Sequence, residues 1–110
     1  MRRQSGEVPK DVLDDIVRRI VEVAKPERII LFGSAARGEM RPNSDIDLLV
    51  IKGGDDDLGR LTERIYQRLH GAKAAVDVIV VTPEAVERYK DAFCLVIYPA
   101  LREGRVIYAA

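Results

Sequence analysis

The sequence has few of the residues on which many small binding proteins depend. It holds a single cysteine, which excludes an internal disulfide and a cysteine-rich zinc site. It has no tryptophan, four tyrosines and two phenylalanines, and its 18 basic residues are balanced by 18 acidic ones. Without a basic field or a set of stacking rings, nucleic acid is an unfavourable partner. No apolar run approaches the ~20 residues of a membrane helix, and no signal-peptide pattern is present, so we expect a cytoplasmic protein with no membrane partner.

What the chain does have is enough apolar material for one core. It is 110 residues long and 47% hydrophobic, with a net charge of zero. That length suits one domain and that composition argues against intrinsic disorder. We therefore expect a single domain over residues 1–110, with a disordered segment at 1–7, and no separate domain to hold a second substrate.

Periodicity along the chain predicts alternating helices and strands. Apolar residues recur at helical spacing or in short buried runs, and glycine and proline separate them. The order predicts an α/β (α+β) domain with a small mixed sheet of about three main strands flanked by helices. The predicted helices cover 9–24, 35–37, 58–69, 83–90 and 92–103, the predicted strands cover 28–32, 45–51 and 76–81, and 105–108 is predicted as a short extended tail.

Three aspartates interrupt the predicted strands. Asp45 and Asp47 alternate with apolar residues, so both side chains project from one face, roughly 7 Å apart. Asp77 is the second residue of the next strand, in an otherwise apolar run where a carboxylate is costly unless its charge is compensated. The helix between the two strands predicts a parallel pair with a right-handed crossover. All three carboxylates are therefore expected to meet at one edge of the sheet.

Repelling carboxylates at one place favour bound cations. Oxygen ligands with open positions suit Mg²⁺ or Mn²⁺, which also take substrate phosphates as ligands. The simpler interpretation is that Asp45, which follows Ser44, only closes a turn. The combination of Asp45, Asp47 and Asp77 favours the metal site.

A glycine–serine turn lies between the first strand and a short helix. Gly33 permits a close approach of the backbone, and free N–H groups at a helix start bind phosphate, although Gly33 and Ser34 could also form a purely structural turn. Gly33 and Gly38 have the glycine spacing of a P-loop, but Glu39 and Met40 occupy the positions where a P-loop needs Lys and Ser or Thr. No dinucleotide-binding fingerprint is present. The turn is thus a candidate phosphate site outside both of these motifs.

Together these segments resemble a known family. The stretches GSAARG (33–38) and SDIDLLV (44–50), with Asp77 after them, are similar to the signature of the polymerase-beta-like nucleotidyltransferases, and above all of the minimal nucleotidyltransferases of prokaryotes. The segment ALREGRVIY (100–108) is also similar to the C-terminal end of that family. The resemblance covers residues ~10–108 and implies a polymerase-beta-like nucleotidyltransferase fold.

The resemblance also implies a role for each residue. Asp45, Asp47 and Asp77 would be the catalytic ligands of two Mg²⁺ ions, or Mn²⁺, and Asp77 would bind the ion that activates the acceptor hydroxyl. Gly33 and Ser34 would hold the β- and γ-phosphates of ATP. Arg37 would make a phosphate contact or a contact within the fold.

The implied function is transfer of AMP to a partner. Minimal members of the family pair with a helical HEPN-type toxin, and the expected reaction is nucleotidylation of a tyrosine of that toxin, which makes the chain an antitoxin. Two alternatives remain: a non-catalytic antitoxin that acts by forming a complex, and a transferase to a small-molecule hydroxyl. Apolar residues in 93–108, including Tyr98 and Tyr108, are more numerous than the core requires, so we expect some of them to close the core and the remainder to form an interface with the partner or with a second copy.

Overall fold

Helices and strands follow one another in nearly the predicted order. The structure, a computed structural model, describes residues 7–41, 43–92 and 97–110. Predicted disorder at 1–7 falls almost wholly outside these residues, as does the segment 93–96 of the last predicted helix. The elements are α1 (Lys10–Ala24), β1 (Arg28–Phe32), α2 (Gly33–Ala36), β2 (Ile46–Ile51), α3 (Leu58–Arg68), β3 (Val76–Val81), α4 (Pro83–Tyr89), α5 (Ile97–Glu103) and β4 (Arg105–Ala109).

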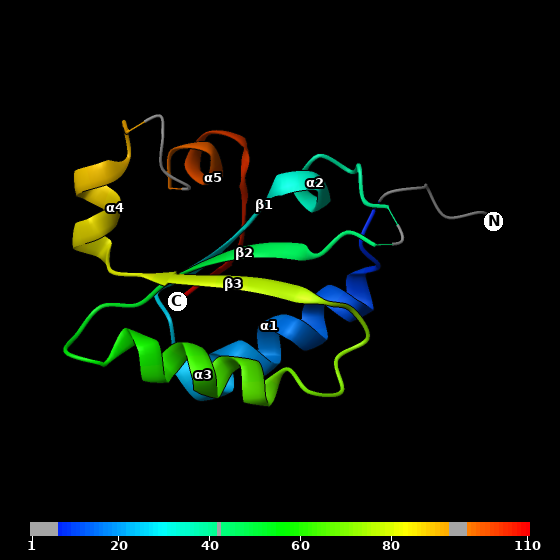
Figure 1. The fold of residues 1–110 in the computed structure, drawn as a ribbon, viewed down its shortest axis with the longest axis horizontal. Coiled ribbons are helices and arrows are strands. Elements are labelled where there is room, and N and C mark those ends of the chain that lie inside the picture. Colours follow the sequence, from blue (N-terminus) through cyan, green and yellow to red (C-terminus); the bar gives the residue numbers. More distant parts are fainter. Residues whose placement is uncertain (1–6, 42, 93–96) are drawn as a thin grey trace.

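A single mixed sheet forms the middle of the domain (Figure 1). Its strand order is β3-β2-β1-β4. β2 and β3 run parallel, as the crossover through α3 predicts, and β1 is antiparallel to both β2 and β4. The sequence-based prediction of an extended tail at 105–108 is corrected here, because this segment is a fourth strand paired with β1. Pairing satisfies the backbone N–H and C=O groups along the side of β1 that β2 leaves open.

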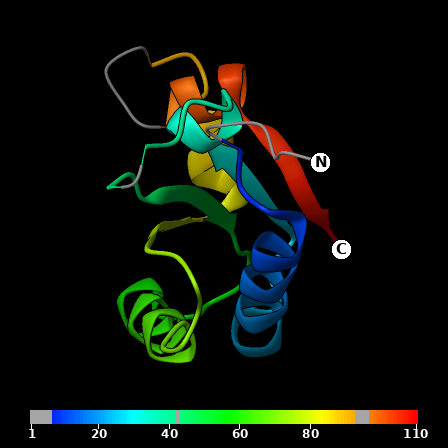
Figure 2. The ribbon, with the colours of Figure 1, turned by 90° about the vertical axis from the view of Figure 1, so that its right-hand side faces the viewer.

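Helices cover both faces of the sheet (Figures 1 and 2). α1 and α3 lie on one face, where Ile16, Ile20 and Ile65 pack against alternate residues of the strands. α4 and α5 lie on the other face, and here Val86 and Ala100 pack against Ile30, Leu49 and Ile51. The buried Ala35 of the short helix α2 belongs to the core on the α1 and α3 side. Among the described residues, no helix combines the length and the apolar character that crossing a membrane requires.

The boundaries of two segments near the aspartates differ from the prediction. The short helix α2 begins at Gly33, immediately after β1, instead of at Ala35. β2 begins at Ile46, so Asp45 is the last residue of the preceding loop. Both differences are of one or two residues, the usual uncertainty of an element's end.

Candidate active site

The three aspartates lie at one end of the sheet, where β1 ends and β2 and β3 begin. Asp47 of β2 pairs in register with Asp77 of β3, and its other neighbour, across the antiparallel pair, is Phe32. The backbone N–H of Ile46 donates to the carbonyl of Ala75 at 2.9 Å, which fixes the start of β2 beside the start of β3. Since neighbouring strands are about 4.8 Å apart, this register brings the Asp47 and Asp77 backbones side by side.

Asp47 is the most enclosed of the three aspartates. Asp45 and Asp77 are exposed, whereas Asp47 is partly buried. Burial, together with the negative charges of Asp77 and Asp45, raises the pKa of Asp47 above its usual value, and the positive charge of Arg37 opposes the rise. The three aspartates therefore form one electrostatic group. The sequence analysis expected a free-energy cost for burying the Asp77 carboxylate. This cost does not arise, because β3 is at the edge of the sheet and the Asp77 side chain is exposed to water.

The carboxylates share this end of the sheet but do not close into a cage. Within residues 7–41, 43–92 and 97–110, no three His, Cys, Asp or Glu side chains are arranged so that they could hold a metal ion by themselves. This arrangement fits Mg²⁺, which proteins bind through one or two carboxylates while substrate phosphates and water complete the coordination. The donors are all oxygen atoms, the type that Mg²⁺ and Mn²⁺ prefer.

Gly33 lies directly against the Asp47 carboxylate. Its φ of +71° is in the left-handed region, and a Cβ built on it would collide with Oδ2 of Asp47 and lie 3.2 Å from Cγ. Gly38 has nearly the same φ, +70°, but a Cβ there would meet only Cγ of Glu7, at 3.9 Å. Both glycines suit the backbone, and Gly33 in addition leaves room for the carboxylate.

Ser34 and Arg37 belong to the same turn. The Ser34 hydroxyl donates to Sδ of Met40 at 3.5 Å. Arg37 donates from Nε to Oε1 of Glu39 at 2.8 Å, and its Nη1 is 3.8 Å from Oε2 of Glu103 on α5. The hydrogen bond to Glu39 is the main reason that the pKa of Arg37 is raised. Arg37 thus contacts the fold and lies close enough to Asp47 to influence its pKa.

One residue of this end was missed by the sequence analysis. The Tyr66 hydroxyl of α3 is 3.3 Å from Oδ1 of Asp77, and it also accepts the backbone N–H of Val78 at 2.7 Å. In the sequence, Tyr66 follows Ile65, which belongs to the apolar face of the predicted helix. Nothing in that pattern indicates contact with an aspartate eleven residues later, because only the crossover brings α3 against β3.

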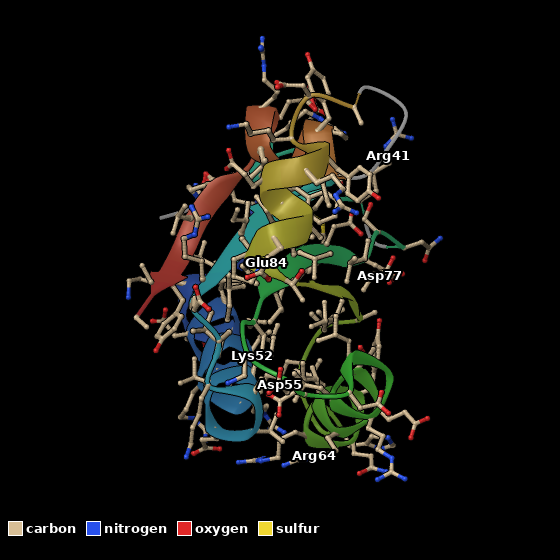
Figure 3. The ribbon with its side chains drawn as sticks, turned by 90° about the vertical axis from the view of Figure 1, so that its left-hand side faces the viewer. Arg41, Lys52, Asp55, Arg64, Asp77 and Glu84 are labelled. Carbon is tan, nitrogen blue, oxygen red and sulfur yellow. The ribbon has the colours of Figure 1, made fainter. Side chains whose placement is uncertain are left out.

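Two open hollows on the surface lie outside the group of three aspartates. One, of about 460 Å³, borders the glycine–serine turn and is lined by Arg37, Gly38 and Arg105 among others. The other, of about 490 Å³, lies between α1 and α3 at the opposite end of the sheet, where Lys52, Asp55 and Arg64 surround it (Figure 3). None of the three aspartates lines either hollow. Size alone therefore does not locate the candidate site, which the carboxylates and the turn define.

The fold and this group of residues define a class of protein. A mixed sheet with paired carboxylates at one end, next to a glycine–serine turn that opens a short helix, is the arrangement implied by the resemblance to nucleotidyltransferases. Residues 12–107 match the family model of the nucleotidyltransferase domain. The chain belongs to this family. No curated protein sequence matches the chain.

Solved structures agree with this assignment at the level of the fold. A Sulfolobus solfataricus protein assigned as a nucleotidyltransferase has a TM-score of 0.53 at 22% identity, over 93% of this chain and 90% of that chain. A toxin–antitoxin structure with AMP-PNP has a TM-score of 0.56 at 22% identity, over 88% and 73%. A mutant of the toxin–antitoxin pair MntA–HpeT has a TM-score of 0.50 at 17% identity, over 94% and 75%.

Proposed function

We propose that this chain is a metal-dependent minimal nucleotidyltransferase that transfers AMP from ATP to a hydroxyl group of a protein partner. In this proposal the acceptor is a tyrosine of a HEPN-type toxin, and the chain acts as its antitoxin. The observation that carries the proposal is the position of Asp47. It stands between Asp77 and the Gly33–Ser34 turn, within the electrostatic influence of both other aspartates.

Each residue of the site has a chemical task in this proposal. Asp45 and Asp47 would hold two divalent ions, and Asp77 would hold the one nearer the acceptor. When bound, these ions lower the pKa of the attacking hydroxyl and neutralise the triphosphate and the leaving pyrophosphate. Gly33 and Ser34 would receive the β- and γ-phosphates, where the absence of a Cβ on Gly33 permits a close approach. Arg37, half exposed, would add positive charge.

The transfer itself is a single displacement at phosphorus. The acceptor oxygen forms a bond to the α-phosphorus, and the bond from that phosphorus to the α–β bridging oxygen breaks. Pyrophosphate leaves with the bridging oxygen, and the hydroxyl proton passes to solvent. The chain's contribution is to hold the reacting groups in line and to exclude other orientations.

The structural neighbours support the nucleotide and the partner. One was solved with AMP-PNP, an ATP analogue, and two are toxin–antitoxin structures. The MntA–HpeT neighbour carries two aspartate-to-glutamate changes two positions apart, the same spacing as Asp45 and Asp47. The similarity to these structures is one of fold. For this chain, the nucleotide and the toxin partner are part of our proposal.

A labelling experiment tests the proposal. The complex isolated from native cells would be incubated with Mg²⁺ and ATP labelled at either the α- or the γ-phosphate. Nucleotidyl transfer predicts protein-bound label from α-labelled ATP alone, and a partner tyrosine heavier by one AMP group in mass spectrometry. Asp77→Asn should abolish labelling, whereas Asp55→Asn, the same change at the opposite end of the sheet, should not.

The other outcomes separate the alternatives. Label from γ-labelled ATP would indicate phosphoryl transfer and contradict the proposal. A complex that neutralises the toxin without any label would indicate a non-catalytic antitoxin. If no protein is labelled while α-labelled ATP is converted to a small product, the acceptor is a small-molecule hydroxyl.

A further inference from the structure

Tyr66 of α3 contacts Asp77, a candidate metal ligand on the edge strand β3. It lies on α3, which packs against the face of the sheet opposite α4 and α5. Asp77 shares its sheet face with Ile79 and Val81, which pack on the α4 and α5 side. The Tyr66 hydroxyl reaches β3 at the outer edge of the sheet. It meets three groups there: the Val78 N–H at 2.7 Å, Oδ1 of Asp77 at 3.3 Å and the Val78 carbonyl at 3.4 Å.

The single hydroxyl proton of Tyr66 has a preferred acceptor. Because the hydroxyl oxygen already accepts the N–H of Val78, the acceptors that the described residues offer its proton are the Asp77 carboxylate and the Val78 carbonyl. A hydrogen bond to an ionised group is roughly twice as strong as one between neutral groups. Donation of the Tyr66 hydroxyl to Oδ1 of Asp77 would leave Oδ2 open to a cation.

The Asp77 side chain is less restrained by its surroundings than the Asp47 side chain. Asp47 is partly buried and confined by Gly33. Asp77 is exposed on an edge strand, and Tyr66 is the one hydrogen-bond partner that the described part of the chain gives its carboxylate. A free carboxylate would lose rotamer freedom on binding an ion, and this loss lowers affinity.

We propose that Tyr66 is a positioning residue that holds Asp77 for its divalent ion. The inference rests on the proposed function, since it takes Asp77 as a metal ligand. Groups that hydrogen-bond to a metal ligand typically change metal affinity or activity 10–100-fold when they are removed. A purely structural role, pairing the edge N–H of Val78, predicts lower stability without a specific effect on the metal.

Mg²⁺ binding to the whole chain separates these two roles. Affinity for Mg²⁺ alone would be measured by titration followed in ¹⁵N–¹H NMR spectra, well below the melting temperature of every variant. Tyr66→Phe keeps the ring and removes the hydroxyl, and we expect it to weaken Mg²⁺ binding about tenfold. The matched control is Tyr89→Phe on α4, because Tyr89 is 37% exposed and Tyr66 is 38% exposed. The control should bind Mg²⁺ as the unmodified chain does.

The double variant tests whether Tyr66 acts through Asp77. If it does, Tyr66→Phe should cause no further loss of Mg²⁺ affinity once Asp77→Asn is present. An equal loss in both backgrounds would overturn the inference. Unchanged affinity in Tyr66→Phe beside a clear loss in Asp77→Asn would overturn it while leaving the proposed function intact. Unchanged affinity in Asp77→Asn would overturn the metal assignment itself.

A measurement on the unmodified chain does not depend on how any variant folds. If Tyr66 contacts the ligand, Mg²⁺ should shift the Tyr66 ring resonances and leave those of Tyr89 in place. Absence of a shift at Tyr66, at Mg²⁺ concentrations that shift the Asp77 amide, would also overturn the inference.

Discussion

Gly33→Ala should disturb both the backbone and the Asp47 carboxylate, and the two effects can be separated. At a φ of +71°, an alanine is in the left-handed region, which costs about 1–2 kcal/mol for a residue with a Cβ. The new Cβ also meets Oδ2 of Asp47, so the carboxylate must rotate away. An off-rotamer side chain costs about 0.5–1.5 kcal/mol. Together we expect a loss of about 1.5–3.5 kcal/mol in the free energy of unfolding.

Gly38→Ala is the matched control for the backbone. Its φ is +70°, and the nearest atom to an added Cβ, Cγ of Glu7, is 3.9 Å away. This variant should therefore lose only the backbone part, about 1–2 kcal/mol. Urea denaturation at one temperature measures both variants. Since 1 kcal/mol shifts the melting temperature by about 4 °C or more in a domain of this size, thermal melting would also resolve the difference.

A double-mutant cycle identifies the steric part. Asp47→Ala removes the carboxylate that an added Cβ would meet, so Gly33→Ala should cost no more than Gly38→Ala in that background. Binding of ATP with Mg²⁺ should be lost in Gly33→Ala and retained in Gly38→Ala, because only the first displaces Asp47. Equal stability losses for the two glycine variants, with equal binding, would refute the close packing of Gly33 on Asp47.

Three further predictions concern charge, ligand and surface. Because the pKa of Asp47 is raised in the folded chain, its ionisation destabilises the fold progressively as the pH rises from the ordinary aspartate pKa, and this loss is complete above the raised value. Metal-free Asp47→Asn should then be the more stable form at pH 7, and the gap should vanish below the ordinary aspartate pKa; a gap that persists in acid urea titrations would contradict this origin. ATP with Mg²⁺ at a hundredfold excess over its Kd should stabilise the fold by about 2.7 kcal/mol, and ATP with EDTA should not, as calorimetry would show. Val106→Lys, at an apolar position that is 51% exposed, should weaken the complex with a partner or second copy without lowering the melting temperature; light scattering that shows the same mass for both chains would argue against an interface at β4.

The last of these refines the interface expected from the sequence. Tyr108 is partly buried and packs against the core beside α1, so Tyr108→Asp would test the fold more than an interface. Ile97 is buried in the structure. Val106 is the member of the predicted apolar patch that is mainly exposed among the described residues. Much of the patch therefore closes the core, and the remaining exposed part is on the edge strand β4.

The sequence by itself predicted most of the helices and strands, and it predicted that Asp47 and Asp77 meet at one end of the sheet. Apolar periodicity is a local property, and it placed β1 and β3 at their observed bounds and α1, α3 and α4 within one residue. The crossover rule gave the parallel pairing of β2 and β3, which puts Asp47 opposite Asp77. Alternation along a strand predicts that Asp45 and Asp47 share one face, and the structure begins the strand at Ile46, one residue after Asp45. The family assignment from 33–38, 44–50 and Asp77 agrees with the match over 12–107.

Only the tertiary structure decided which residues contact Asp47 and Asp77 and whether the C-terminal segment pairs with the sheet. Whether 105–109 is a tail or a strand depends on the open edge of β1, which no local pattern reveals. Exposure of Asp77 follows from the edge position of β3, and the contact of Gly33 with Asp47 follows from the pairing of β1 with β2. Tyr66 meets Asp77 because α3 packs across the edge of the sheet. Each of these contacts joins segments distant in sequence, and packing of whole layers sets their geometry.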